Sequence, residues 1–199
     1  MWQNLISRKF FKENPLKEIS SQRLVYMLVS NEGLEQLASQ VARDYLNLSP
    51  ARLVSVDQER AMLSMLQDPV EIFQLMRKSI DGLNRTFLID KALEFEDDLY
   101  PLVIEKLIRS NHDTFIDNAI RFLGACKTNC SDVFERRYSE IRSPYVQSLI
   151  CILLGLKANE RIISWMLERF YELKRLFPEE NYDQGPLVAM HELKRRFPN

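Results

Sequence analysis

A short helical sequence that occurs more than once constrains the fold of this chain more than any other feature. Residues 89–95 read Ile-Asp-Lys-Ala-Leu-Glu-Phe, and residues 116–122 read Ile-Asp-Asn-Ala-Ile-Arg-Phe. A looser third copy lies at 146–155, and residues 189–193 are a candidate fourth. The chain therefore carries an internal repeat, and repeated helices of this kind stack on one another.

The spacing of the copies indicates how much structure each repeat contains. Their aligned positions, 27, 31 and 39 residues apart, are Ala92, Ala119, Ile150 and Ala189. This spacing is in the range of one helix pair per repeat. We therefore expect each aligned side chain to lie in the hydrophobic seam between neighbouring helices.

Proline residues mark where many of the helices begin. Proline is tolerated at the first helical position, and a small or polar residue before it can cap the helix. This pattern occurs at Asn14-Pro15, Ser49-Pro50, Asp68-Pro69, Ser143-Pro144 and Gly185-Pro186. Together with apolar residues at a period of 3.6, it predicts helices at residues 2–12, 16–30, 32–47, 50–66, 69–81, 85–96, 99–110, 113–126, 131–141, 144–156, 160–177 and 185–197.

The composition favours the same fold class. The 199 residues include only five glycines, whereas β-hairpins and bulges use glycine freely. Hydrophobic residues make up 46% of the chain, which is ordinary for a globular protein. The longest apolar runs, such as residues 149–154, are shorter than the roughly 18 residues needed to cross a bilayer. We expect one all-α domain over residues 1–199, without a membrane span.

Residues 85–197 resemble HEAT-type repeats. The resemblance rests on Asp-Asn-Ala-Ile-Arg-Phe-Leu-Gly at 117–124 and on the segment 143–155, which opens with Ser-Pro-Tyr-Val and closes with Leu-Leu-Gly. In that family the second helix of each pair has a small residue in its middle and closes with Leu-Gly. The resemblance implies a right-handed array of antiparallel helix pairs, an α-solenoid. Residues 1–84 are predicted to be helical, and their membership of the repeats stays open.

The cysteines favour a reducing compartment, because an odd number of them cannot all pair within the chain. We expect Cys126, Cys130 and Cys151 to be buried or half-buried thiols of a cytoplasmic protein. The alternative is a metal clip by Cys126 and Cys130. A structural zinc site needs four ligands, however, and the nearest histidine is the lone His112. We expect neither a metal nor a cofactor.

The net charge of −1 lacks the basic excess with which proteins neutralise phosphates, so we expect no strong nucleic-acid binding. Helical arrays offer long concave surfaces that suit scaffolds and adaptors. The sequence therefore favours a non-catalytic protein that binds a protein partner. The alternative is an enzyme similar to the alkylpurine DNA glycosylases, which are HEAT-like and need an Asp and a Trp at the lesion. Asp117 and Trp165 are the candidates for those two roles.

The candidate binding residues lie on the second helices of the repeats: Asp117, Asn118, Arg121, His191 and Arg195. His191 has the register of Arg121, and the simpler interpretation is a solvated position. Arg195 belongs to a basic run beside an aromatic residue, as on nucleic-acid surfaces. Lys and Arg are also expected near a helix C-terminus because of the helix dipole.

The helix predicted at residues 144–156 is apolar on every side and needs cover all round. Leu149 and Ile152 stand at the registers of Asn118 and Arg121. We expect both side chains to be buried in the monomer. The alternative is that a partner covers them.

Four carboxylates lie within residues 94–98. We expect this segment to end one helix and to cap the next at Asp98. The alternative is a site that attracts a cation or a basic partner, although the spacing is not that of a calcium loop.

Overall fold

The computed structural model describes residues 50–198, with side chains from residue 54 onward. The chain divides into two compact units, residues 1–58 and 59–199, and the sites discussed below lie in the second unit. The single domain expected over the whole chain stays a prediction. Three expected helices lie outside the described residues, namely those at 2–12, 16–30 and 32–47.

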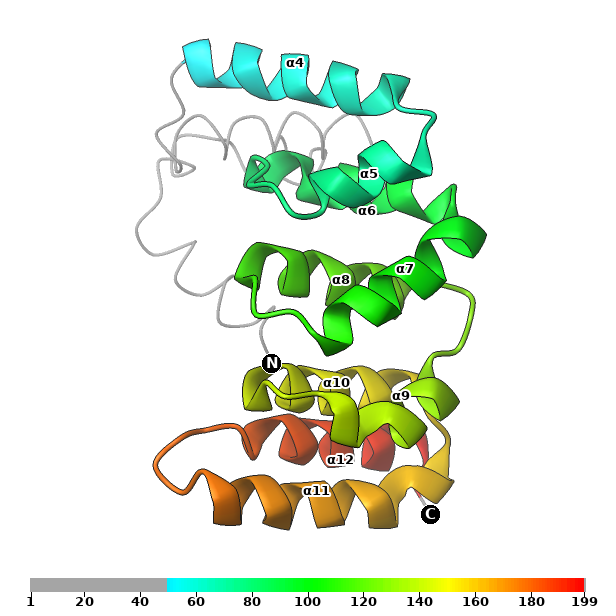
Figure 1. Ribbon diagram of the computed structural model, residues 1–199, viewed down its shortest axis with the longest axis vertical. Helices are drawn as coiled ribbons and strands as arrows, with labels where there is room; N and C mark the ends of the chain where they lie inside the picture. The colour runs from blue at the N-terminus through cyan, green and yellow to red at the C-terminus, as the bar shows by residue number, and fades with distance from the viewer. Residues whose placement is uncertain (1–49, 199) are drawn as a thin grey trace, which may run out of the picture. The chain divides into compact units, whose positions relative to one another are not determined.

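Every regular element within residues 50–198 is a helix (Figure 1), which confirms the all-α prediction. The α-helices are α4 (Pro50–Met65), α5 (Pro69–Leu75), α6 (Gly82–Leu93), α7 (Glu96–Ile108), α8 (Asp113–Ala125), α9 (Ser131–Arg137), α10 (Pro144–Lys157), α11 (Ile163–Leu176) and α12 (Gln184–Arg196). Two short 3₁₀ helices, η2 (Tyr138–Glu140) and η3 (Glu160–Ile162), follow α9 and precede α11.

Proline begins two of these helices in the way that the sequence predicts. The Asp68 carboxylate accepts a hydrogen bond from the Val70 backbone N–H at 2.8 Å, one residue after Pro69. The Ser143 hydroxyl accepts from the Val146 N–H at 3.4 Å. Such caps satisfy backbone donors that the first helical turn leaves free.

Several helix boundaries differ from the predicted ones, and three of them lie between α5 and α7. α5 ends at Leu75 and not at residue 81. α6 begins three residues early, because the Asp81 carboxylate caps it by accepting from the Leu83 N–H at 3.0 Å. α7 begins at Glu96, so Asp98 lies inside its first turn and the prediction that Asp98 caps the helix was wrong. Three acidic residues in this turn complement the positive end of the helix.

Four helices pack in sequence, each against the next. α6 contacts α8, α8 contacts α10, and α10 contacts α12. The intervening helices attach to this series: α5 contacts α6 and α7, α7 contacts α6 and α8, α9 contacts α10, and α11 contacts α12. In Figure 1, α10 accordingly lies between α8 and α12. The repeated sequences fall on α6, α8, α10 and α12.

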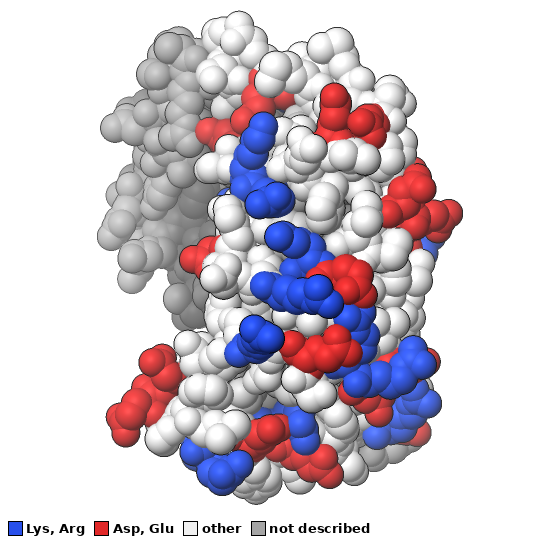
Figure 2. Space-filling view, in the orientation of Figure 1, with Lys and Arg blue, Asp and Glu red and all other residues white. Residues whose placement is uncertain are grey.

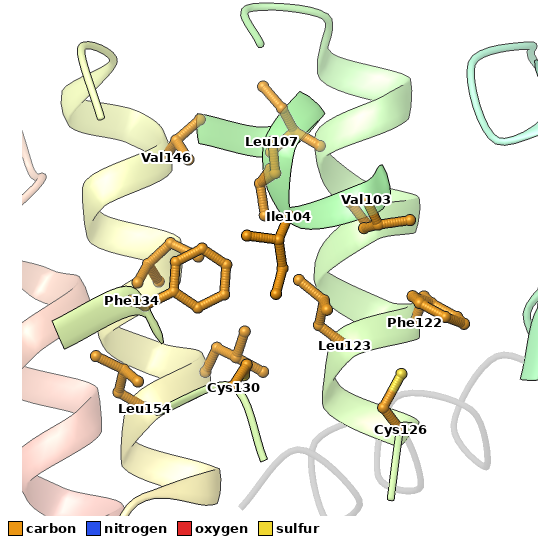
Figure 3. Packing of buried hydrophobic residues seen from close by; sticks show 14 of the residues in the cluster. Val103, Ile104, Leu107, Phe122, Leu123, Cys126, Cys130, Phe134, Val146 and Leu154 are labelled. Carbon is orange, nitrogen blue, oxygen red and sulfur yellow. The ribbon is translucent and has the colours of Figure 1, made fainter. Parts of the chain in front are cut away.

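The hydrophobic core runs through all of these contacts. Figure 3 shows side chains of α7, α8, α9 and α10 meeting around Ile104, Leu123 and Phe134. The aligned repeat positions are all fully buried, as the repeat predicts: Ala92, Ala119, Ile150 and Ala189. Three of them are alanines, and a small side chain lets helix backbones approach, as at Ala189, which lies against Gly155 of α10.

The closest helix contact is that of α10 with α12. A Cβ atom built on Gly185 would lie 2.1 Å from the Ser148 backbone oxygen, and one built on Gly155 would lie 2.5 Å from the Ala189 Cα. Real Cβ atoms do not approach other atoms this closely, so both positions need glycine. Backbone contact at two points fixes α12 against α10.

Leu149 and Ile152 correct a prediction, because both are half-buried and not buried. α10 packs on α12 through Ser148 and Gly155, and the Leu153 side chain faces Gly124 of α8. At 100° per residue, Leu149 and Ile152 project from another side of the helix. The cover that an apolar helix needs is therefore incomplete on that side.

Candidate functional site

One side of α10 carries a line of incompletely buried apolar residues, which we name the α10 stripe: Tyr145, Leu149, Ile152 and Leu156. Their spacing of four, three and four residues places them on one face of the helix. Tyr145 is 44% exposed and Leu156 is 48% exposed, while the two residues between them are half-buried. Large apolar side chains in a line at the surface are a feature of interaction sites.

On one side of α10, α8 contributes the predicted residues Asp117 and Arg121. Asp117 accepts hydrogen bonds from Arg85 of α6 at 2.7 Å and from Arg121 at 3.1 Å. All three side chains are at least 36% exposed, so these ion pairs add little stability. In the repeat register, Arg121 corresponds to Ile152 of α10.

Asn118 lies in the protein interior and is only 2% exposed. Its side-chain amide donates a hydrogen bond to the Met76 backbone oxygen at 3.0 Å. Met76 follows the last residue of α5, where carbonyl groups lack helical partners. Asn118 thereby joins α8 to the C-terminal end of α5, and its side chain is not at the surface.

On the other side of α10, α12 contributes His191 and Arg195, which are both exposed. In the repeat register they correspond to Ile152 and Leu156 of the α10 stripe. Arg195 forms an ion pair with Glu192 at 2.8 Å. His191 also lines a shallow hollow of about 450 Å³ on α12. Val188, which is 43% exposed, lines the same hollow and has the register of Leu149.

These residues share the repeat register or lie along α10, and their helices are neighbours. We name this set of residues the inner face and define it as the α10 stripe together with Arg121 of α8 and Val188, His191 and Arg195 of α12. An apolar centre on α10 is thus flanked by polar side chains on both adjacent helices. Of the predicted site residues, Arg121, His191 and Arg195 are exposed at the register of the α10 stripe, Asp117 is bound to Arg121, and Asn118 is buried.

Tyr145, Leu156 and Val188 were not among the predicted site residues. The apolar side chains of α10 were assigned to the core, since the helix is apolar all round. The repeat register could have indicated that these positions are exposed. The corresponding positions of α8 are Thr114, Asn118, Arg121 and Ala125, of which only Asn118 is buried.

The acidic segment at 94–98 lines a hollow of about 620 Å³ together with Lys127 and Thr128. Glu96 has a structural role there, because its carboxylate accepts the backbone N–H groups of Lys127 at 2.9 Å and Thr128 at 2.7 Å. Burial raises the pKa of Glu96, but these hydrogen bonds outweigh it and hold the pKa below its ordinary value. Within residues 50–198, no group of His, Cys, Asp and Glu side chains is arranged to hold a metal ion.

Replacing Glu96 with Gln is expected to lower the free energy of unfolding by about 1 kcal/mol at pH 7, because a charged acceptor forms the stronger hydrogen bonds. Since folding lowers the pKa of Glu96, its contribution is present above the unfolded pKa of about 4.3 and is lost as the pH falls through the folded pKa. Urea unfolding of both proteins at pH 7 and pH 3 checks this, with exposed Asp97→Asn as the control. A stability difference that persists at pH 3 would contradict it.

The three cysteines are free and buried, as predicted. Burial raises the pKa of Cys126 and Cys151 to about 12 and that of Cys130 to about 11. The thiols are therefore protonated at neutral pH and are poor nucleophiles. The Sγ of Cys151 lies 3.6 Å from the Tyr138 hydroxyl.

Trp165 takes part in an aromatic contact that attaches α11 to the rest of the unit. Its ring meets Tyr138 edge to face at 5.0 Å, and the Arg169 guanidinium lies 5.4 Å from the Trp165 ring and 5.6 Å from the Tyr138 ring. Asp117, the other residue considered for a glycosylase, is held between Arg85 and Arg121. The two residues thus belong to separate sets of contacts.

The fold and the inner face define an all-α protein with an exposed apolar stripe flanked by polar residues. Within residues 50–198, no helix has the length and apolar character that crossing a membrane requires. In comparisons with known proteins, no family model matches the chain, and no curated protein or solved structure matches it either.

Proposed function

We propose that this protein binds another protein through its inner face. The α10 stripe is the observation that carries the proposal. Protein interfaces have an apolar or aromatic centre that is dehydrated on binding and a polar rim around it. Tyr145 and Leu156 supply exposed apolar surface, and Arg121, His191 and Arg195 supply the rim.

We further propose that the helices form a HEAT-like, right-handed array of antiparallel pairs. The order of contacts supports this, because α6, α8, α10 and α12 each pack against the next and each follows a helix of the other set in the chain. The burial of the repeat-register residues on these four helices supports it as well. In such an array the second helices line a concave surface, which is where the inner face would lie.

The protein would then act as a non-catalytic scaffold or adaptor in the cytoplasm. Three protonated, buried thiols are compatible with a reducing compartment. The near-neutral net charge of −1 favours a protein partner over nucleic acid, because each phosphate contact requires a cation.

Replacing Leu156 with Asp is expected to weaken partner binding about tenfold or more, since a charge at the centre of a dehydrated contact costs at least 1–2 kcal/mol. The melting temperature should change little, because Leu156 is 48% exposed. Leu102→Asp on α7 is the matched control, since Leu102 is 45% exposed and lies outside the inner face. Partners are first identified by a photo-crosslinking residue placed at position 156 or 102 in the native host, and affinities are then measured by calorimetry.

Equal crosslinking from both positions would contradict the proposal. So would an affinity that Leu156→Asp and Leu102→Asp reduce to the same extent. Loss of binding by Leu156→Asp alone, with unchanged melting, assigns the inner face as the interface.

A further inference from the structure

A second candidate site lies away from the inner face, at the C-terminal end of α7. A hollow of about 580 Å³ opens there between α7 and the link from η2 to α10, lined by Ile108, Arg109, Ser139, Glu140 and Arg142. Figure 2 shows Lys and Arg side chains gathered over the middle of the face on which α7 and α9 lie, with acidic side chains among them.

The acidic residue of this hollow already has a partner. Arg137 donates hydrogen bonds to the Glu140 carboxylate from Nε and Nη2, the shortest at 2.8 Å from Nη2, and also pairs with Glu105. Hydrogen bonds from Arg137 accordingly lower the pKa of Glu140. Glu140 therefore contributes a neutralised charge to the hollow and not a free one.

The two arginines of the hollow have no such partner. Within the part of the chain that the structure describes, the side chains of Arg109 and Arg142 form no hydrogen bond and no ion pair. Counting Arg137, the hollow and its immediate surroundings hold three arginines and the two carboxylates of Glu105 and Glu140. The exposed Ser139 hydroxyl is available as a further donor.

The helix dipole explains the position of one arginine but not of the other. Arg109 follows the last residue of α7, where a cation complements the negative end of the helix dipole. Arg142 directly precedes Ser143, the N-cap of α10, where the helix dipole is positive and disfavours a cation. The position of Arg142 is therefore favoured by a nearby anion, and no described residue forms an ion pair with it.

We propose that this hollow binds a phosphate group, held by the guanidinium groups of Arg109 and Arg142 and by the Ser139 hydroxyl. A phosphate monoester carries nearly two charges and three acceptor oxygens, so it can accept hydrogen bonds from two guanidinium groups and a hydroxyl. A carboxylate, with one charge, is neutralised by a single guanidinium group. The ligand is thus a phosphate carried either by a small molecule or by a phosphorylated side chain.

A titration of the full chain with inorganic phosphate tests the site, at constant ionic strength in chloride. The arginine Nε–H signals are followed by NMR. We expect saturable shifts of two arginine signals, and Arg142→Gln and Arg109→Gln should each weaken binding about tenfold, the cost of one charged hydrogen-bonding partner. Arg175→Gln is the control, because Arg175 is exposed on α11 and outside the hollow. Its binding should equal that of the parent.

The absence of any saturable shift of an arginine Nε–H signal up to about 10 mM phosphate would overturn the proposal, because even a weak anion site binds in that range. Equal weakening by all three variants would overturn it too. A phosphoserine peptide and its unphosphorylated form distinguish the two sources. Tighter binding of the phosphopeptide than of inorganic phosphate, dependent on Arg142, assigns a phosphorylated chain, and equal binding assigns a small phosphate.

Discussion

Replacing Gly185 with Ala is expected to destabilise the protein by about 3 kcal/mol, the upper part of the range for overpacked sites. The new Cβ atom would lie 2.1 Å from the Ser148 backbone oxygen and 2.7 Å from its carbonyl carbon. Backbone atoms cannot move aside as a flexible side chain can, so α12 would have to separate from α10. For a chain of 199 residues this corresponds to a melting temperature lower by roughly 6–12 °C.

Gly82→Ala is the matched control for that substitution. Gly82 is the first residue of α6, and a Cβ atom built there meets no atom within 4 Å. Alanine also favours a helix over glycine by up to about 1 kcal/mol, so the control should melt at or above the temperature of the parent. If Gly185→Ala melts like Gly82→Ala, the close approach of α10 and α12 is wrong.

Much of this fold could be predicted from the sequence because its signals are local. Asp68-Pro69 and Ser143-Pro144 carry their caps within three residues of the helix start, and the repeat register identifies buried positions such as Ala119 and Ile150. The Asp81 cap was missed because no proline follows it. The early start of α7 at Glu96 was missed because this acidic segment was assigned to a helix end and a cap at Asp98, although acidic residues also favour a first helical turn.

The candidate site was less predictable because it depends on which sides of α10 its neighbours cover. The sequence indicates that α10 is apolar all round, but not that contact with α12 occurs through Ser148 and Gly155. Only that contact leaves the side with Tyr145 and Leu156 open. Asn118 differs from the prediction in the opposite way. Its polar side chain was expected at the surface, but it is buried and donates a hydrogen bond to the Met76 carbonyl oxygen.

Replacing Ile150 with Ala is expected to cost about 2–5 kcal/mol, because it removes buried methyl groups and leaves a cavity. Ile150 is completely buried, whereas Ile152, two residues along the same helix, is half-buried. Ile152→Ala is therefore a control with the same chemistry and helix propensity, and it should cost less than half as much. Urea unfolding of both variants measures the two free energies.

The comparison of these two isoleucines also decides whether the α10 stripe is covered within the monomer or is free to contact a partner. Equal losses would mean that Ile152 is covered within the monomer, and the inner face would then lack its apolar centre. A large loss at Ile150 with a small one at Ile152 leaves the stripe free to contact a partner. In that case Ile152→Ala should weaken partner binding although the fold is nearly unchanged, because the methyl groups that it removes are dehydrated only in the complex.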